Sequence, residues 1–279
     1  DPAQPTRYEA SLGEHSRRRR RMAVELRRAI REGELEVHFQ PILPASSAPG
    51  ALSRHKFEAL SRWHLDGEPV SPAEFIPIVE SAGLSGALLR LVIERACQAV
   101  VALRERGTEC TVTVNVPAVA SVMRDLPDDL VALCAAHGVA PSSIGIEITE
   151  STFFDDDDSW RAPFARLRGM GVQVAIDDFG TGFNSLVCLE RLPADVIKLD
   201  RTFIAQIFSS RRQARICATL IGLAHELMLK VVAEGVEEEA QRAWLCEQGC
   251  DELQGYLLGR PAPLAHLLQP AAWTAGRVA

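Results

Sequence analysis

Long apolar runs and aromatic residues are scarce in this 279-residue sequence. Aromatic residues make up 6% of it, and no run of about 18 or more apolar residues occurs, so no segment is predicted to span a bilayer. The charged, proline-containing N-terminal residues do not resemble a signal peptide. We therefore expect a cytoplasmic domain, and any membrane anchor of a longer parent protein would lie outside these residues.

Closely paired cysteines are also lacking. The seven cysteines include no C-x-x-C pair and lie scattered within apolar patterns, which favours reduced thiols over a disulfide framework. Cys246 and Cys250 have helical i,i+4 spacing and could share a metal ion. Because free cysteine is among the most buried residue types, we expect both to be core thiols instead.

An excess of positive charge is lacking as well, since the formal net charge is −7. Wrapping nucleic acid requires the neutralisation of many phosphates, so no DNA binding is expected. A small anionic substrate is compatible with this charge, because bound metal ions can offset it. With 47% hydrophobic and 24% charged residues, the composition is that of a globular protein with a substantial core.

The chain divides into a polar N-terminal extension and one large domain. Residues 1–21 end in an arginine run at 17–21, which is expected to be a solvated linker, and a helical pattern of apolar residues follows from Met22. We place the domain at residues 22–270 and a C-terminal tail at 271–279. Since the sequence begins on Asp-Pro without an initiator methionine, we expect a longer protein with a further upstream domain.

Short runs rich in Val, Ile and Leu recur along the domain and alternate with helical patterns. Eight runs are candidate strands, at residues 35–43, 55–63, 111–116, 144–149, 172–179, 196–200, 230–236 and 252–258. Between most of them lie candidate helices, at residues 72–106, 126–137, 160–170, 211–228 and 238–248. This alternation indicates an α/β fold, specifically a barrel of parallel strands.

One connection departs from this pattern. Residues 44–54 contain Ala-Ser-Ser-Ala-Pro-Gly and are too few for the helical crossover that joins parallel strands. The first two strands are therefore predicted to be antiparallel. The expected fold is a modified (β/α)8 TIM-like barrel with its first strand antiparallel.

Acidic residues lie near the ends of several of these apolar strands. In parallel barrels the C-terminal ends of the strands carry catalytic residues, so acids that are distant in sequence are expected to converge there. Clustered carboxylates bind either protons or a cation, and oxygen ligands suit Mg²⁺ or Mn²⁺. The candidate residues are Glu58, Asn115, Glu147, Asp177, Asp178, Asp200 and Glu234.

Two features of this set favour phosphoryl chemistry. The adjacent acids Asp177 and Asp178 could address two different ions, which together would stabilise the charge of a phosphoryl transition state. Lys198 could then orient water or stabilise charge. It could instead form a Schiff base, although neighbouring carboxylates would keep it protonated. A magnesium-dependent lyase or racemase with Lys198 as its base is a further interpretation.

A set of short motifs runs in order along the domain. Glu58-Ala59-Leu60 is followed directly by Ser61-Arg62-Trp63. The others are Phe39-Gln40-Pro41-Ile42, Pro72-Ala73-Glu74-Phe75-Ile76-Pro77, Glu147-Ile148-Thr149-Glu150, Asp177-Asp178-Phe179-Gly180-Thr181-Gly182, Lys198-Leu199-Asp200-Arg201, Glu234-Gly235-Val236-Glu237 and Gln254-Gly255-Tyr256. The set covers about residues 22–268 and resembles the EAL-domain family of cyclic di-GMP phosphodiesterases.

The resemblance implies a metal-dependent phosphodiesterase that opens cyclic di-GMP to linear 5′-pGpG, with two Mg²⁺ or Mn²⁺ ions per site. It implies that Lys198 and Glu234 handle the attacking water, with Glu234 as general base in a one-metal mechanism. The implied metal ligands are Glu58, Asn115, Glu147, Asp177 and Asp178. The implied substrate contacts are Gln40, Leu60, Arg62 and Gln254, and the implied supporting residues are Glu150, which would anchor the loop after Asp178, and Glu237.

The same resemblance implies a homodimer whose interface lies near the loop that follows Asp178. Many family members bind cyclic di-GMP without cutting it, so a catalytically silent receptor is the alternative function. Such members usually lose metal ligands, whereas this sequence keeps them all, which favours hydrolysis. One departure is Asn115-Val116-Pro117 in place of the family's usual Asn-Leu-Ser, because Pro117 removes a backbone donor near Asn115.

Overall fold

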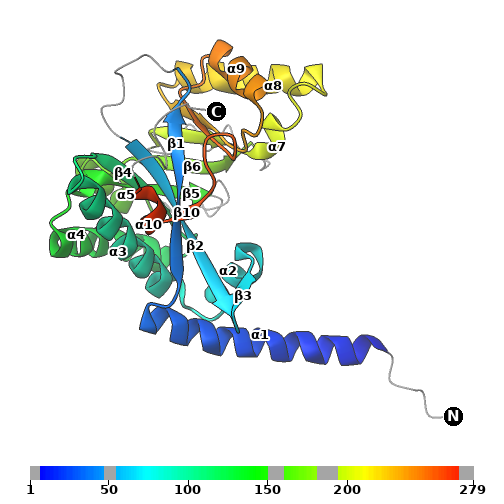
Figure 1. Ribbon diagram of the computed structural model, residues 1–279, viewed down its shortest axis with the longest axis vertical. Coiled ribbons are helices and arrows are strands. Elements are labelled where there is room, and N and C mark those ends of the chain that lie inside the picture. The colour runs from blue at the N-terminus through cyan, green and yellow to red at the C-terminus, as the bar shows by residue number, and fades with distance from the viewer. Residues whose placement is uncertain (1–6, 47–54, 150–159, 181–193, 270–279) are drawn as a thin grey trace.

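Eight strands close into a barrel, and helices cover its outside (Figure 1). The fold is taken from a computed structural model that describes residues 7–46, 55–149, 160–180 and 194–269. The barrel strands are β1 (Glu36–Pro44), β2 (His55–Leu65), β4 (Cys110–Asn115), β5 (Ile144–Thr149), β6 (Val174–Phe179), β7 (Val196–Leu199), β8 (Lys230–Ala233) and β9 (Glu252–Gln254).

The strand order confirms the predicted modified barrel. The order is β1-β9-β8-β7-β6-β5-β4-β2, and β2 pairs back with β1. β1 is antiparallel to both of its neighbours in the barrel, while the other pairs around the barrel are parallel. β4, β5 and β7 are buried almost throughout, as their continuous Val and Ile content predicts for parallel strands covered on both faces.

The predicted helix over residues 72–106 is wrong in one respect, because two helices occupy it. α2 (Pro72–Ser81) ends before Gly83, whose φ of 67° is left-handed, and α3 (Ser85–Arg104) begins two residues later. The backbone N–H of Leu84 donates to Val79 O at 2.9 Å and closes the end of α2. Glycine therefore ends the first helix, and the chain turns before starting the second.

The other predicted elements are found with shifted ends, while the short helices at 201–204 and 264–267 and the 3-10 turn at 141–143 were not predicted. β8 and β9 are shorter than predicted, because the chain turns after Ala233 and Gln254, and β3 (Glu68–Val70) and β10 (Ala262–Pro263) were not predicted. The other helices are α4 (Ala120–His137), α5 (Arg161–Gly169), α7 (Arg201–Ile204), α8 (Arg211–Glu226), α9 (Glu239–Glu247) and α10 (Leu264–Leu267), with a 3-10 turn at Pro141–Ser143.

The barrel interior is built in layers. Small apolar side chains form one layer, whose members are Ile42, Ala175, Val196 and Val232. Below it, Lys56 Nζ lies 2.6 Å from Glu252 Oε1 and donates to Gln173 Oε1 at 3.1 Å. Above it stand the polar side chains at the ends of the parallel strands. The apolar layer thus separates a structural ion pair from the predicted site.

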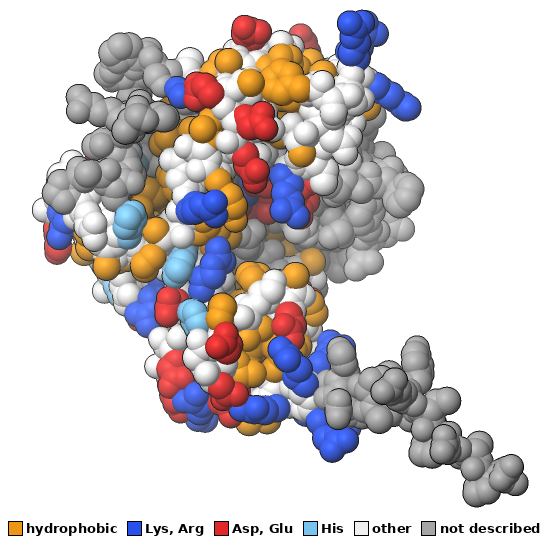
Figure 2. Space-filling view, turned by 45° about the vertical axis from the view of Figure 1, so that its right-hand side comes forward, with side chains coloured by type: hydrophobic (Ala, Val, Ile, Leu, Met, Phe, Trp, Pro, Cys, Tyr) orange, Lys and Arg blue, Asp and Glu red, His pale blue; other side chains and the backbone are white. Residues whose placement is uncertain are grey.

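The N-terminal helix α1 (Arg7–Glu32) extends away from the barrel and begins well before Met22 (Figure 1). Met22 and Leu26, both 0% exposed, pack its C-terminal half against the domain. Arg18 and Arg21 form ion pairs with Glu74 and Asp66. Figure 2 shows basic and acidic side chains interspersed along this lower edge of the molecule.

The cysteine side chains of the described residues belong to the packed interior. Cys246 Sγ donates to Ala45 O at 2.9 Å, and Cys250 Sγ lies 3.3 Å from Glu252 O, so each thiol contacts backbone carbonyls. Six cysteines in the described ranges are free thiols. Over the same ranges, none of the helices combines the length and apolar character needed to cross a lipid bilayer.

Candidate active site

A buried lysine stands at the centre of the converging strand ends. Lys198 on β7 is 1% exposed, and its Nζ approaches carboxylates from four other strands or strand ends. The distances are 2.5 Å to Glu147 Oε2, 2.5 Å to Glu234 Oε1, 3.1 Å to Asp177 Oδ1 and 3.3 Å to Glu58 Oε2. The barrel therefore brings together residues that are up to 176 positions apart, because parallel strands end at one rim.

The side chains of Asp177 and Asp178 both lie at this rim because β6 is irregular. Neighbouring side chains of a regular strand point to opposite faces, but the pairing of β6 with β7 shifts register between Ile176 and Phe179. Asp178 takes a left-handed φ of 52°, which aspartate tolerates better than most residues. As a result, one oxygen each of Asp177, Asp178 and Glu234 lie within 4.8 Å of one another.

A chain of amide side chains holds Glu58 in place. Asn115 Nδ2 donates to Glu58 Oε1 at 2.7 Å, and Gln254 Nε2 donates to Glu58 Oε2 at 2.6 Å. Gln254 Nε2 also lies 3.2 Å from Gln40 Oε1, and Gln40 Nε2 donates to Gly259 O at 3.1 Å. Residues from β1, β2, β4 and β9 thus form one network around the carboxylate.

The electrostatics follow from burial and from the central lysine. Burial and the nearby Glu58 raise the pKa of Glu147 well above its usual range, and burial raises the pKa of Glu234 to about 8. Burial opposes ionisation of Glu58 too, but Lys198 and the donors Gln254 and Asn115 hold its pKa below the usual value. The carboxylates outweigh burial at Lys198 and raise its pKa, which disfavours a neutral Schiff-base nucleophile.

The residues present fit a divalent cation. Gln254 Oε1 is a buried acceptor that receives no hydrogen bond in the described part of the chain, and Asp177 Oδ1 has only the shared ammonium group of Lys198, at 3.1 Å. Five carboxylates face one ammonium group, so full ionisation leaves four negative charges uncompensated, from Glu58, Glu147, Asp177, Asp178 and Glu234. Oxygen donors with uncompensated negative charge are the ligand set of Mg²⁺ and Mn²⁺.

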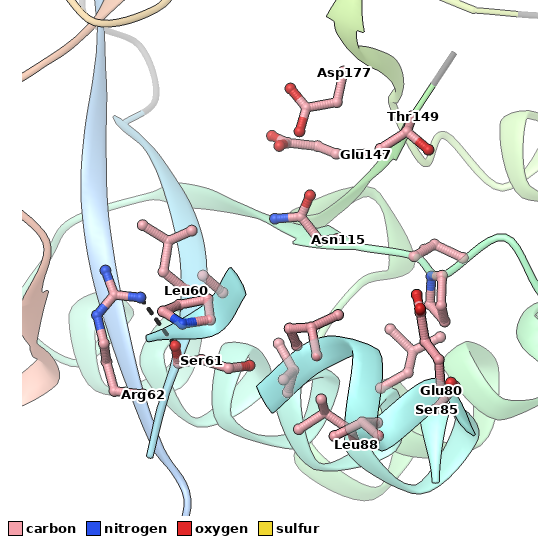
Figure 3. A pocket seen from close by; sticks show the side chains of 18 of the residues that line it. Leu60, Ser61, Arg62, Glu80, Ser85, Leu88, Asn115, Glu147, Thr149 and Asp177 are labelled. Atoms are coloured by element: carbon pink, nitrogen blue, oxygen red, sulfur yellow. Dashed lines mark hydrogen bonds between the residues drawn. The ribbon is translucent and has the colours of Figure 1, made fainter. Parts of the chain in front are cut away.

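Two cavities flank the acidic residues. The first, about 340 Å³, extends from Leu60 and Arg62 past Asn115, Glu147 and Asp177 to α2 and α3 (Figure 3). The second, about 270 Å³, is lined on the other side by residues of β1, β7 and the segments after β8 and β9. Leu60 and Asp177 line both. The predicted substrate residues are thus divided between two spaces that meet at the acids.

The other predicted residues have varied positions. Arg62 is half-buried, burial lowers its pKa, and its Nη1 donates to Ser61 O at 2.9 Å at the rim of the first cavity. Glu237 is exposed and lines the second cavity. Glu150 lies outside the described residues. Asp200 accepts from Thr202 N at 3.0 Å and caps α7, so this acid serves the helix rather than the cluster.

One feature of the site was missed from the sequence. Tyr256, 51% exposed, lines the second cavity, and the Arg260 guanidinium carbon lies 4.2 Å from the centroid of its ring. Such a cation–π pair holds an exposed aromatic ring at the edge of the site. The available signal was an aromatic residue two positions after a strand end with an arginine four positions later.

The chain is similar to known proteins over most of its length. The family model described as EAL domain matches residues 23–261. The bifunctional diguanylate cyclase/cyclic di-GMP phosphodiesterase MucR of Pseudomonas aeruginosa is 36% identical over 267 residues, 95% of this chain and 38% of that protein. The cyclic di-GMP phosphodiesterase NbdA of the same organism is 41% identical over 248 residues, 88% of this chain and 31% of that protein.

A solved structure supports the same relationship. A PaMucR phosphodiesterase structure in complex with c-di-GMP superimposes with a TM-score of 0.79 at 37% identity, covering 88% of this chain and 99% of that one. The chain spans about a third of the length of the curated relatives named above. The family model alone spans more than half of the chain. The chain therefore belongs to the EAL domain family.

Proposed function

We propose that this domain hydrolyses cyclic di-GMP to linear 5′-pGpG. The observation that carries the proposal is the buried Lys198 surrounded by Glu58, Glu147, Asp177 and Glu234 at one rim of an EAL barrel. The two relatives named above, which align with 95% and 88% of this chain, are named as cyclic di-GMP phosphodiesterases. No position of the implied ligand set has lost its oxygen donor, so the chain retains the groups that phosphodiester hydrolysis needs.

Two divalent cations, Mg²⁺ or Mn²⁺, complete this proposed site. Glu58, Asn115, Glu147 and Asp177 would hold one ion, and Asp177 with Asp178 would hold the other. When bound, the ions supply positive charge to the phosphate and lower the pKa of the attacking water. The buried Gln254 Oε1, which receives no hydrogen bond among the described residues, and Asp177 Oδ1, which shares the one Lys198 ammonium group with three other carboxylates, support this assignment.

Lys198 and Glu234 handle the water in this proposal. Glu234 Oε1 lies 2.5 Å from Lys198 Nζ, and burial raises its pKa to about 8, so its ionised carboxylate is a stronger base than that of a free glutamate. Lys198 remains protonated among the carboxylates and donates hydrogen bonds that fix the positions of Glu234 and the water. In a two-metal mechanism no separate base is required, and Glu234 then acts mainly by orientation.

Substrate binding uses both cavities. Arg62 presents a planar fork of donors that matches phosphate oxygens, while Leu60 stands between the two cavities and packs against the sugar or base. Gln40 and Gln254, linked to each other and to Glu58, contact the ligand from the opposite wall. Glu237 supports the second cavity, and Glu150 is assigned to the anchoring of the loop that follows Asp178.

The working protein is proposed to be larger and dimeric. Because the chain spans about a third of its curated relatives, an upstream domain is proposed to regulate this one. A homodimer is proposed with its interface near the loop that follows Asp178. Residues 22–270 are proposed to be the catalytic unit.

Chromatography of reaction products tests the proposed function. Purified protein is incubated with cyclic di-GMP and Mg²⁺ or Mn²⁺, beside an EDTA control and the variants Glu58→Ala and Glu68→Ala. Glu68 is an exposed acid on β3, outside both cavities, and serves as the matched control. The proposal is supported if wild type and Glu68→Ala form pGpG with metal, while Glu58→Ala and the EDTA control do not. Binding without product in either metal would make the domain a receptor, and absence of binding would refute both functions.

A further inference from the structure

An exposed acidic side chain lies at one end of the first cavity. Glu80 on α2 lines this cavity. Figure 3 shows it at the opposite end of the cavity from Leu60 and Arg62, with the acids of the strand ends between them. Its carboxylate forms no ion pair or hydrogen bond with any residue that the structure describes. Glu80 therefore has acceptor oxygens that are available to a ligand in this cavity.

The position of Glu80 in its helix is electrostatically unfavourable. The macrodipole places partial negative charge at the C-terminal end of a helix, and Glu80 lies in the last turn of α2. Glu74 provides the contrast, because it lies in the first turn of the same helix and pairs with Arg18 at 3.0 Å. An acid that destabilises its own helix and lines a ligand cavity is a departure of the kind that functional sites show.

The space between Glu80 and the strand-end acids has apolar walls. Its apolar lining residues are Ile76 and Val79 from α2, Leu88, Leu89 and Val92 from α3, and Val116 and Pro117 after β4. The acids are the proposed position of the metal ions and therefore of the phosphate that is cleaved. A base that is joined to this phosphate through its sugar extends into the apolar space, and its outer edge then faces Glu80.

We propose that Glu80 is a specificity residue that accepts hydrogen bonds from one guanine base of the substrate. This inference rests on the proposed function. The Watson–Crick edge of guanine carries two adjacent donors, N1–H and the N2 amino group, which match the two oxygens of one carboxylate. Adenine carries an acceptor, N1, at the corresponding place, and a carboxylate repels it. Glu80 therefore selects guanine over adenine at this end of the cavity.

Steady-state kinetics of Glu80→Ala test the inference. Glu74→Ala is the matched control, because Glu74 is an acid of the same helix that lies outside the lining of the first cavity. Hydrogen bonds to charged groups are among the stronger ones, so Glu80→Ala should raise KM for cyclic di-GMP about tenfold, with kcat within about twofold. Glu80→Gln keeps one acceptor oxygen and should have an intermediate KM. Glu74→Ala should match wild type in both quantities.

The sign of the effect separates a contact from general electrostatics. The substrate is an anion, so removal of a negative charge from the cavity would by itself strengthen binding and lower KM. A raised KM therefore reports lost hydrogen bonds. Cyclic di-IMP, whose hypoxanthine bases lack the N2 amino group, measures one of them directly. The ratio of KM for cyclic di-IMP to KM for cyclic di-GMP should be about threefold smaller in Glu80→Ala than in wild type.

Thermal unfolding separates binding from folding. Loss of an acid from the last turn of α2 should raise the Tm of ligand-free Glu80→Ala by about 1–2 °C, while binding weakens. A KM that is unchanged or lowered, or an unchanged ratio between the two substrates, would overturn the inference. If wild type binds cyclic di-GMP without cutting it, hydrolysis fails as a function, and Kd replaces KM in the same comparison. If wild type does not bind it, both proposals fail.

Discussion

At the scale of single residues, the charge of the site depends on one lysine. Lys198 partly neutralises four carboxylates that burial alone would protonate. The repulsion between these carboxylates can be reduced in two ways, by binding protons or by binding a cation. This competition makes the stability of the metal-free protein dependent on pH.

The raised pKa of Glu234 predicts the direction of this dependence. Its pKa of about 8 lies above the ordinary value of 4.5, so the folded state holds a proton that the unfolded state has lost between these pH values. Stability attributable to Glu234 is therefore present at low pH and decreases as pH rises from about 5 to 8. In EDTA, the Tm of wild type should decrease over this range more steeply than the Tm of Glu234→Gln.

Divalent cations should reverse this trend. Metal binds the ionised carboxylates, so with saturating Mg²⁺ the wild-type Tm should no longer decrease between pH 5 and 8. Differential scanning calorimetry of wild type and Glu234→Gln, each with EDTA and with Mg²⁺, gives four curves of Tm against pH. Identical slopes for wild type and Glu234→Gln in EDTA would show that Glu234 is ionised throughout and would contradict the assignment.

The exposed ring of Tyr256 predicts a second effect at this scale. Stacking of a base on an aromatic side chain is worth about 1–3 kcal/mol by alanine substitution. Tyr256→Ala should therefore raise KM for cyclic di-GMP about tenfold with little change in kcat, and Tyr256→Phe should behave as wild type. Phe208→Ala is the matched control, because Phe208 is 58% exposed and lines neither cavity. An equal defect in Tyr256→Phe would assign the effect to the hydroxyl instead.

Sequence patterns predicted the acids of the site better than the contacts between them. Glu58, Glu147 and Asp177 follow from acids at the ends of apolar strands, because barrel geometry converges those ends. The joint approach of Lys198 to four carboxylates depends on side-chain conformations that no spacing encodes. That the buried hydroxyl of Ser85 has no hydrogen-bond partner among the described residues was not predictable either, since only packing decides whether a hydroxyl meets a partner.

At the scale of elements, the turn after β9 forms part of the wall of the second cavity. The N–H of Leu257 donates to Val236 O at 3.1 Å, and the N–H of Val236 donates to Gln254 O at 3.0 Å. A Cβ on Gly255 would lie 2.1 Å from Val236 O, so the two segments touch through backbone alone. This contact fixes both Gln254 on one side of the glycine and Tyr256 on the other.

Gly255→Ala is therefore predicted to disturb both stability and binding. Backbone atoms cannot yield to the added methyl group, so we expect a loss of about 3 kcal/mol or more in the free energy of unfolding and a raised KM. Gly222→Ala in α8 is the matched control, because a Cβ there meets nothing within 4 Å, and it should stabilise the protein by about 0.5–1 kcal/mol. Urea unfolding measures both, and equal stability of the two variants would contradict the close contact.

Element types were predictable from the sequence, while their ends were not. The period of the apolar residues identified all eight barrel strands, and the short 44–54 connection gave the antiparallel first strand. The break at Gly83 was missed, because apolar periodicity continues from α2 into α3. The early end of β9 was missed for a similar reason, since Leu257 and Leu258 are apolar residues of a turn that packs against the core.

At the scale of the whole molecule, α1 runs without a break from the predicted N-terminal extension into the domain. Its inner half packs Met22, Leu26 and Ala29 against the domain, while its outer half reaches beyond the barrel (Figure 1). The ion pairs Arg18–Glu74 and Arg21–Asp66, which join α1 to the domain, have side chains at least 43% exposed. Apolar packing, rather than these pairs, is therefore expected to fix the helix to the barrel.

Two truncations test this expectation and the proposed domain boundary. A fragment of residues 22–279 loses the exposed ion pairs of Arg18 and Arg21, each worth about 0–1 kcal/mol, so its Tm should stay within about 4 °C of the full chain. A fragment of residues 34–279 also loses Met22 and Leu26, whose burial is worth about 2–5 kcal/mol each, and should be unfolded or nearly so at 25 °C. Circular dichroism melts and pGpG formation are the measurements. A large loss of Tm in the first fragment would show that residues 1–21 belong to the folded unit, whereas a stable second fragment would show that the barrel is independent of α1.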